Sequence, residues 1–287
     1  MTIVVTGATG NLGGVVVDSL LRRGVPAGEI VAAGRDRDRL AALAGKGVRT
    51  ATIELGDPAS LRAAFEGAER MLLVSGNEIG NRVALHTNAI EAAGDAGVGH
   101  VVYTSFPKAA TTSILLAAEH RGTEEALAAS GLPATVLRNN IYLENYAGRA
   151  AEHVASGTIL GSAGEGRICS VLRDELAEAA AAVLTTDGHE GAVYELGGEG
   201  FTLAELAAAI ATRSGRPVEY RDLPVDEFKG VLLGAGLPEA FATILADSDR
   251  GAAQGELDVP PDDLQRLLGR PATTMAEAVT AALAGSG

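Results

Sequence analysis

Cysteine is almost absent from this chain, since Cys169 is the only one among 287 residues. A single cysteine cannot form an internal disulfide bond, and such bonds are typical of proteins in oxidising compartments. Only Arg167 lies close enough in sequence to favour a thiolate, so we expect an inert thiol. The cysteine content predicts a reducing, cytoplasmic location.

Positive charge is also scarce, with 23 lysines and arginines against 37 acidic residues and a net charge of −14. Nucleic-acid affinity comes largely from basic side chains that neutralise phosphates, so this balance argues against a nucleic-acid partner. No apolar run approaches the ~20 residues that a membrane helix needs. Histidine, cysteine and carboxylates do not cluster at metal-ligand spacing. We therefore expect neither a membrane span nor a metal site.

The first half of the chain alternates short apolar runs with helix-like segments. Most of the runs are continuous rather than alternating, which is typical of parallel strands covered on both faces. Helix signals separate them, such as Asp57 at an N-cap followed by Pro58. The pattern predicts an α/β fold with a doubly wound parallel Rossmann sheet. The predicted strands are residues 3–5, 30–33, 48–53, 71–74, 100–104 and 134–137.

The pattern changes after Asn140, where helical and glycine-rich segments take over. Thr202 and Thr274 each begin a capping box, a pattern that predicts the start of a helix. The remaining expectations are helices at 143–154 and 174–184, a possible hairpin at 157–171, a strand at 193–196 and a possible strand at 216–221.

These elements predict two domains. We expect a Rossmann domain of residues 1–140 plus about 170–197, and a smaller, mostly helical substrate-binding lobe of residues 141–169 plus 198–287. A cleft between such parts is the usual place for a substrate.

A glycine-rich loop, Gly7-Ala-Thr-Gly10-Asn-Leu-Gly13, joins the first predicted strand to the first predicted helix. Gly7 permits a tight turn, Gly10 lets the backbone approach a pyrophosphate, and Gly13 allows close packing of helix against strand. The helix N-terminus then offers N–H groups to the phosphates. At the start of a βαβ unit, this spacing predicts a dinucleotide site.

The residue after the second predicted strand indicates which dinucleotide binds. Sites for NAD usually carry an acidic residue there, whereas an arginine suits the additional 2′-phosphate of NADP. Arg35 occupies this position, and we interpret the nearby Arg37 and Arg39 as solvated helix residues. The predicted cofactor is therefore NADP(H).

Several longer motifs resemble the NmrA-like family of atypical short-chain dehydrogenase/reductases. Within it, the sequence is most similar to the bacterial type 2 NAD(P)H:quinone oxidoreductases, which are related to triphenylmethane reductases. The most specific motif is Leu137-Arg-Asn-Asn-Ile-Tyr-Leu-Glu-Asn-Tyr146, and the resemblance covers essentially the whole chain. The other matching stretches are residues 5–13, 73–78, 103–105, 119–124, 188–196 and 245–249.

The resemblance implies a set of cofactor contacts. Those to the adenosine and phosphate half would come from Gly7, Thr9, Gly10, Asn11, Leu12 and Arg35. Those beneath the ribose and nicotinamide would come from Ser75, Gly76, Asn77, Thr104 and Ser105. The second set follows two predicted strands, at the sheet edge where ligands bind in this fold. Glu54 replaces an aspartate that contacts adenine in many relatives, which leaves that contact open.

The catalytic pair of ordinary short-chain dehydrogenases, Tyr-x-x-x-Lys, is missing. Leu116 and His120 stand where the resemblance would place it. Leucine transfers no proton. His120 either bonds the nicotinamide ribose or donates a proton, or it is a hydrogen-bonded histidine on a partly buried helix face. Quinones suit such a site because hydride delivery with protons from water suffices.

Tyr142 and Asn145 follow the sixth predicted strand and are candidates for contacting an aromatic acceptor, with His120 as the third catalytic candidate. Tyr146 either joins them or packs the lobe onto the core. The predicted function is an NADPH-dependent reductase that transfers hydride to a quinone or similar conjugated acceptor. The alternatives are a non-catalytic NADP(H)-binding redox sensor and a reductase of a dye, azo, imine or ketone acceptor. We expect a small-molecule partner only, in a monomer or homodimer.

Overall fold

Seven strands form one sheet in the computed structural model, which describes residues 1–76 and 78–285. The strand order is β3-β2-β1-β4-β5-β6-β8, and the strands from β3 through β6 all pair in parallel, with Val4 opposite both Val31 and Met71. The order reverses between β1 and β4, which is the switch point where such sheets bind ligands. The predicted doubly wound Rossmann fold is confirmed. The strands are β1 (Ile3–Val5), β2 (Ile30–Gly34), β3 (Arg49–Thr52), β4 (Arg70–Leu73), β5 (His100–Ser105), β6 (Ala134–Asn139) and β8 (Val193–Leu196).

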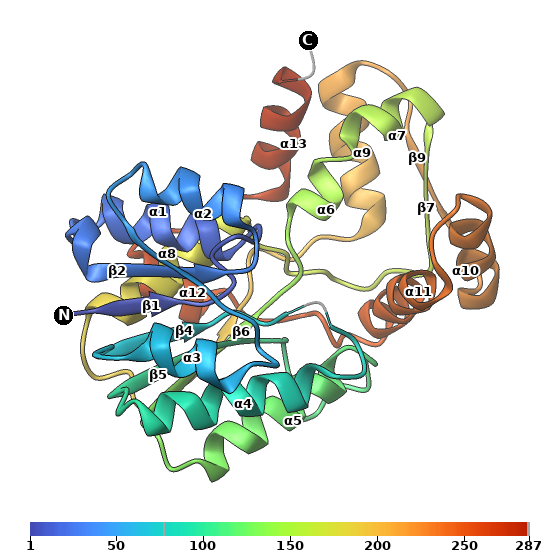
Figure 1. The fold of residues 1–287 in the computed structure, drawn as a ribbon. Coiled ribbons are helices and arrows are strands. Elements are labelled where there is room, and N and C mark those ends of the chain that lie inside the picture. Colours follow the sequence, from blue (N-terminus) through green and yellow to red (C-terminus); the bar gives the residue numbers. More distant parts are fainter. Residues whose placement is uncertain (77, 286–287) are drawn as a thin grey trace. The chain divides into compact units, whose positions relative to one another are not determined.

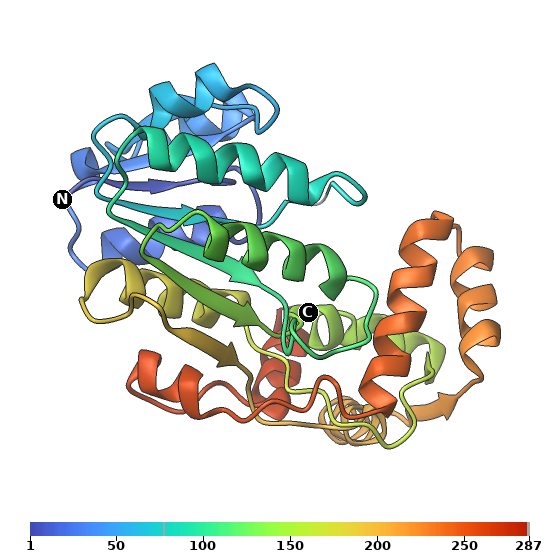
Figure 2. The same cartoon turned by 90° about the horizontal axis from the view of Figure 1, so that it is seen from below.

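Helices cover both faces of this sheet (Figures 1 and 2). One face carries α1 (Gly13–Arg22), α2 (Arg37–Ala44) and α8 (Arg173–Thr185), and the other carries α3 (Pro58–Phe65), α4 (Arg82–Asp95) and α5 (Ala117–Ala129). A short 3₁₀ turn, η1 (Ala27–Glu29), precedes β2. The core between sheet and helices includes Phe65, Met71 and Tyr103, all fully buried. The edge strand β3 is largely exposed, unlike the others.

The chain forms two compact units. Unit 1 consists of Met1–Phe106, Glu119–Arg138 and Arg173–Tyr194, and unit 2 of Pro107–Ala118, Asn139–Leu172 and the chain from Glu195 onward. The sequence-based division differs from this mainly at Pro107–Ala118, which it placed in the Rossmann domain.

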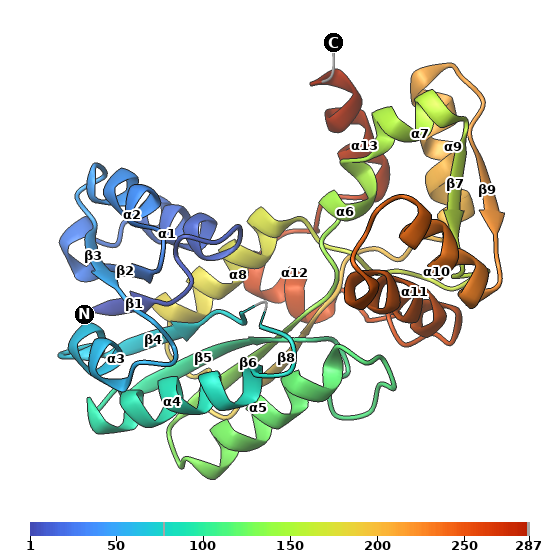
Figure 3. The same ribbon diagram turned by 45° about the vertical axis from the view of Figure 1, so that its right-hand side comes forward.

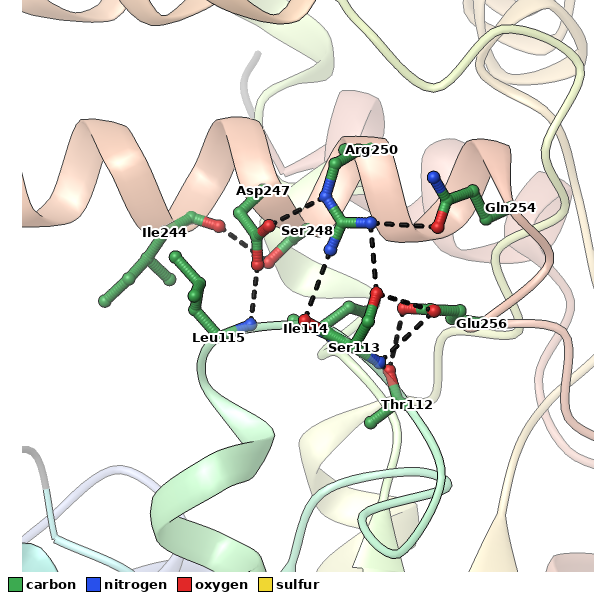
Figure 4. Close-up of polar contacts among 10 residues, drawn as sticks. All are labelled: Thr112, Ser113, Ile114, Leu115, Ile244, Asp247, Ser248, Arg250, Gln254 and Glu256. Carbon is green, nitrogen blue, oxygen red and sulfur yellow. Dashed lines mark hydrogen bonds and ion pairs between the residues drawn. The ribbon is translucent and has the colours of Figure 1, made fainter.

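Contacts with α11 (Glu239–Ala253) and the loop after it explain why Pro107–Ala118 belongs to unit 2 (Figure 4). The backbone N–H of Leu115 donates to Asp247 at 2.7 Å. The hydroxyls of Thr112 and Ser113 donate to the Glu256 carboxylate at 2.9 and 2.8 Å. Polar contacts over so long a sequence separation leave no local signal in the sequence.

Unit 2 contains a two-stranded parallel sheet of β7 (Thr158–Gly161) and β9 (Glu219–Asp222), with Ile159 opposite Tyr220 (Figure 3). Our prediction of a possible hairpin over 157–171 was therefore wrong, because β7 pairs with a strand that is distant in the sequence. A parallel pair requires a crossover, which α9 (Leu203–Ser214) supplies. The other helices of unit 2 are α6 (Glu144–Ala147), α7 (Ala150–Ser156), α10 (Val225–Gly234), α11, α12 (Asp262–Leu268) and α13 (Met275–Ala284).

The described residues contain neither a membrane-crossing helix nor a group of metal-binding side chains. None of their helices combines the length and apolar character that crossing a bilayer requires. None of their histidine, cysteine and acidic side chains gather in threes or more in a way that would hold a metal ion.

Candidate active site

The glycine loop turns tightly between β1 and α1. Gly7 has a φ of +60°, which a side chain would strain, and its carbonyl accepts from the N–H of Gly10 at 2.8 Å. A β-carbon at Gly13 would overlap that same carbonyl. Within the described part of the chain no side chain caps α1, whose first turn follows the buried Leu12. The exposed residues Gly10 and Asn11 thus lie beside a helix N-terminus, an arrangement suited to phosphates.

Thr9 of this loop lies against the end of β2. A β-carbon at Gly34 would come within 2.6 Å of the Thr9 hydroxyl oxygen, so the two segments touch only because residue 34 is glycine. The Arg39 guanidinium donates to the Thr9 carbonyl at 2.7 Å. Arg39 is the solvated helix residue that we expected, with 61% of its side chain exposed, and the first turn of α2 also brings this side chain onto the loop.

Arg35 follows β2 directly, and 64% of its side chain is exposed. Its Nη1 pairs with the Glu78 carboxylate at 2.9 Å. Glu78 belongs to the segment after β4, and no local pattern in the sequence indicates this pairing. An exposed guanidinium at this strand end is available to an anionic group.

The strand ends of β4 and β5 bring two predicted residues together. Thr104 accepts from the backbone N–H of Ser75 at 2.9 Å, and its hydroxyl donates to the Ser75 hydroxyl at 3.3 Å. Thr6, at the end of β1, accepts from the Val74 N–H at 3.1 Å. The predicted residues Ser75 and Thr104, together with Thr6, which was not predicted, thus lie at the carboxyl ends of three adjacent strands. Asn77 lies outside the described residues.

Two side chains of α4 fix the backbone of Gly76. The Arg82 Nε donates to the Gly76 carbonyl at 3.0 Å, and His86 Nε2 accepts from the Gly76 N–H at 3.3 Å. Arg82 also pairs with Glu119 at 3.3 Å. Burial, with help from Arg82, lowers the pKa of His86 to about 4, so the imidazole stays neutral and can accept. The four-residue spacing of Arg82 and His86 was the signal that sequence reasoning missed.

His120 lies within unit 1 and only 5% of it is exposed. Its Nδ1 is 2.9 Å from the Tyr103 hydroxyl, and the Phe106 ring centroid is 6.0 Å away. Burial lowers the pKa of His120 well below its usual value, and the charge of Arg82 adds to this effect. Burial also raises the pKa of Tyr103, so both partners are neutral near pH 7. The geometry is that of a neutral, hydrogen-bonded histidine.

Ser105 is bound to a partly buried ion pair, Arg138–Glu124. Its hydroxyl donates to Glu124 Oε1 at 2.5 Å. Arg138 donates to both oxygens of that carboxylate, at 3.0 and 2.7 Å. A bidentate pair of this kind fixes both side chains, so the Ser105 hydroxyl is held in one orientation.

Tyr142 and Asn145 share one turn of unit 2. The Asn145 N–H donates to the Tyr142 carbonyl at 3.0 Å, and the Asn145 side chain is exposed. Tyr142 forms an isolated bridge with Val171. Tyr146 packs edge-on against Phe201 at a centroid distance of 5.6 Å, which is a packing contact within unit 2.

Cys169 is buried, and this burial raises the pKa of its thiol to about 11.

Asp249 of α11 is a buried carboxylate that accepts from the Ser162 N–H at 2.8 Å. Burial, with repulsion from Asp222, raises the pKa of Asp249 from 3.8 to about 6. The unfolded chain therefore loses this proton first as the pH rises, and stability falls between about pH 4 and pH 6.

Replacing Asp249 with asparagine tests whether ionisation of this carboxyl lowers the stability of the protein. The amide oxygen keeps the acceptor for Ser162 but carries no charge. We expect Asp249→Asn to be more stable than the parent by roughly 1–3 kcal/mol at pH 7.5 and nearly equal to it at pH 4. Urea unfolding at both pH values measures this, and a variant less stable at pH 7.5 would contradict it.

The glycine loop, the arginine after β2 and the switch point define a Rossmann-type dinucleotide-binding fold. The model of the NmrA-like family matches residues 1–260, and the chain belongs to this family. This confirms the resemblance drawn from the motifs.

Individual relatives match over nearly their whole length. Quinone oxidoreductase 2 of Escherichia coli (strain K12) is 44% identical over 279 residues, which are 97% of each chain. The structure of an E. coli NADPH-dependent quinone oxidoreductase complexed with NADPH has a TM-score of 0.96 and 43% identity, covering 98% of this chain and 100% of that one. Triphenylmethane reductase of Citrobacter sp., complexed with NADP(H), has a TM-score of 0.93 and 40% identity, with 98% and 100% covered.

Proposed function

We propose that this protein is an NADPH-dependent reductase that transfers hydride to a quinone or similar conjugated acceptor. The observation that carries the proposal is Arg35, whose exposed guanidinium follows β2 beside the glycine loop. An acidic residue there would favour NAD, whereas the arginine fits a 2′-phosphate. The relative with 44% identity, named a quinone oxidoreductase, supports the choice of acceptor.

The residues present fit a dinucleotide. Side chains at Gly13 or Gly34 would fill the space that keeps the loop close to β1 and β2. The loop at Gly10 and Asn11, beside the N-terminus of α1, would bind the pyrophosphate, and Arg35 would bind the 2′-phosphate. Ser75, Gly76, Thr104 and Ser105 would hold the ribose and nicotinamide half. The bound cofactor supplies a hydride donor.

We further propose that catalysis needs no Tyr-x-x-x-Lys pair. Leu116 has no titratable group, and buried His120 is neutral and bonded to Tyr103. We assign His120 the structural role among the two that the sequence left open, with protons coming from water. Tyr142 and Asn145 would contact the acceptor, with unit 2 as the substrate-binding part.

His120→Ala tests this assignment. The Tyr103 hydroxyl loses its buried partner, so we expect the free energy of unfolding to fall by about 2 kcal/mol. We expect kcat to change by less than about threefold and its pH profile between pH 6 and 8 to keep its shape. Tyr103→Phe, which removes the same hydrogen bond from the other side, is the matched control. A tenfold loss of kcat in His120→Ala alone would instead make the histidine catalytic.

The proposed activity is tested by following NADPH oxidation with a panel of acceptors. The panel contains benzoquinones and naphthoquinones, triphenylmethane and azo dyes, and simple ketones. We expect the highest kcat/KM with quinones and none with ketones, because neither Leu116 nor the neutral, buried His120 would supply a proton to a carbonyl oxygen. A higher kcat/KM with dyes than with quinones would instead favour a dye reductase. Oxidation with no acceptor, despite NADPH binding, would favour the redox sensor.

A further inference from the structure

The ion pair between Arg35 and Glu78 spans the candidate cofactor site of unit 1. Arg35 follows β2 and Glu78 follows β4, and both strands pair with β1 on opposite sides. The 2.9 Å contact between Arg35 Nη1 and Glu78 Oε1 therefore bridges the end of β1, where the glycine loop begins.

The Glu78 carboxylate also lies against the backbone of Gly76. A β-carbon at Gly76 would overlap Glu78 Oε2, so the carboxylate occupies the space over that glycine. Gly76 itself is fixed by Arg82 and His86. The Glu78 side chain is only 29% exposed, which fits a carboxylate held between Gly76 and Arg35.

We propose that Glu78 competes with the 2′-phosphate for Arg35 and thereby limits the preference of the protein for NADPH over NADH. This inference rests on the proposed function. A carboxylate and a phosphate both bind the guanidinium fork, and the Glu78 carboxylate already holds Nη1. A phosphate that pairs with Arg35 must displace this carboxylate or bind beside its negative charge. NADH carries no 2′-phosphate and leaves the pair intact.

The size of the effect follows from the exposure of the pair. An ion pair at the surface contributes little free energy. This contribution corresponds to about a two- to fivefold change in a binding constant. Removing the charge of Glu78 should tighten NADPH binding by this factor and leave NADH binding unchanged. If Glu78 instead served to orient Arg35 for the phosphate, its removal would weaken NADPH binding.

The test is a fluorescence titration of the whole protein with NADPH and with NADH at low ionic strength. Glu78→Gln keeps the side-chain shape and removes the charge. Glu91→Gln, at an exposed position of α4, removes one charge elsewhere and is the control. We expect Glu78→Gln to lower the Kd of NADPH about two- to fivefold and to change that of NADH by less than 1.5-fold. Glu91→Gln should change neither.

A second background isolates the pair. In Arg35→Gln protein, Glu78→Gln should improve NADPH binding less than it does in the parent, because the competition needs the guanidinium and only repulsion between the carboxylate and the phosphate remains. Weaker or unchanged NADPH binding in Glu78→Gln, or equal changes for both nucleotides, would overturn the inference. Failure of the parent protein to bind NADPH would instead overturn the proposed function, so the two failures are distinct.

Discussion

Arg35→Asp should lower kcat/KM for NADPH by about 100-fold while changing that for NADH by no more than about threefold. Hydrogen bonds to charged groups contribute about 1.5–3 kcal/mol each, and a guanidinium fork makes two with a phosphate. Losing both corresponds to at least 100-fold. The aspartate also adds repulsion against the phosphate, next to the Glu78 carboxylate already there. Steady-state kinetics with both nucleotides measures the effect.

Arg37→Asp is the matched control, because it makes the same charge change two residues away at an exposed position. Aspartate suits that position, since Arg37 begins α2 and a negative charge is favourable at a helix N-terminus. We expect a NADPH effect below about threefold. Equal losses for NADPH and NADH in Arg35→Asp would show that Arg35 shapes the site without reading the phosphate.

Gly13→Ala should weaken NADPH binding by about 30-fold or more and lower the melting temperature by about 3–10 °C. The new β-carbon would overlap the Gly7 carbonyl and approach the Ala8 Cα at 2.9 Å. Neither backbone segment gives way cheaply, because Gly7 is held in a left-handed turn and Ala8 donates to Ala33 at 3.0 Å. Overpacking of this kind costs about 1–3 kcal/mol and moves the phosphate-binding N–H groups.

Gly94→Ala separates this effect from the general cost of changing a helical glycine. Gly94 lies within α4, and no atom of the described chain outside its own helix backbone and neighbours lies within 4 Å of a β-carbon there. Alanine favours the helix by about 0.5–1 kcal/mol, so this variant should melt slightly higher and bind NADPH unchanged. Calorimetry and nucleotide titration of both variants measure the difference. A Gly13→Ala protein that binds NADPH like the parent would refute the packing argument.

The sheet could be predicted because its signals are local. Ile3–Val5 and Ile30–Gly34 are continuous apolar runs, and both are fully buried parallel strands. The helix after the glycine loop likewise follows from residue spacing. The class of fold and the position of the loop between the first strand and the first helix therefore followed from the sequence alone.

Contacts between distant segments could not be predicted. The glycine-rich stretch 157–171 suggested a hairpin. Instead, Gly157 ends α7, Gly164 lies in a loop with a positive φ, and β7 pairs with β9. Arg39 and Glu78 look like surface residues in the sequence, yet the fold brings one onto Thr9 and the other onto Arg35. Such partners follow from tertiary packing, which no local pattern encodes.

The burial of His120 was equally hidden. The sequence places it on a helix at the position of a catalytic lysine in ordinary relatives, which favoured neither of its two roles. Only the fold shows Tyr103 of β5 as its partner and the low exposure that keeps both neutral. Desolvation by the surrounding core, rather than residue identity, sets its chemistry.

The most direct test of the proposed function is a single-turnover reaction without oxygen. The protein is mixed with one equivalent of NADPH and excess benzoquinone, and the nucleotide absorbance is followed against a protein-free control. We expect decay at least about 100-fold faster than the control, and loss of this acceleration in Arg35→Asp. Tight NADPH binding with decay no faster than in the control would contradict a reductase and leave a dinucleotide-binding protein without this chemistry.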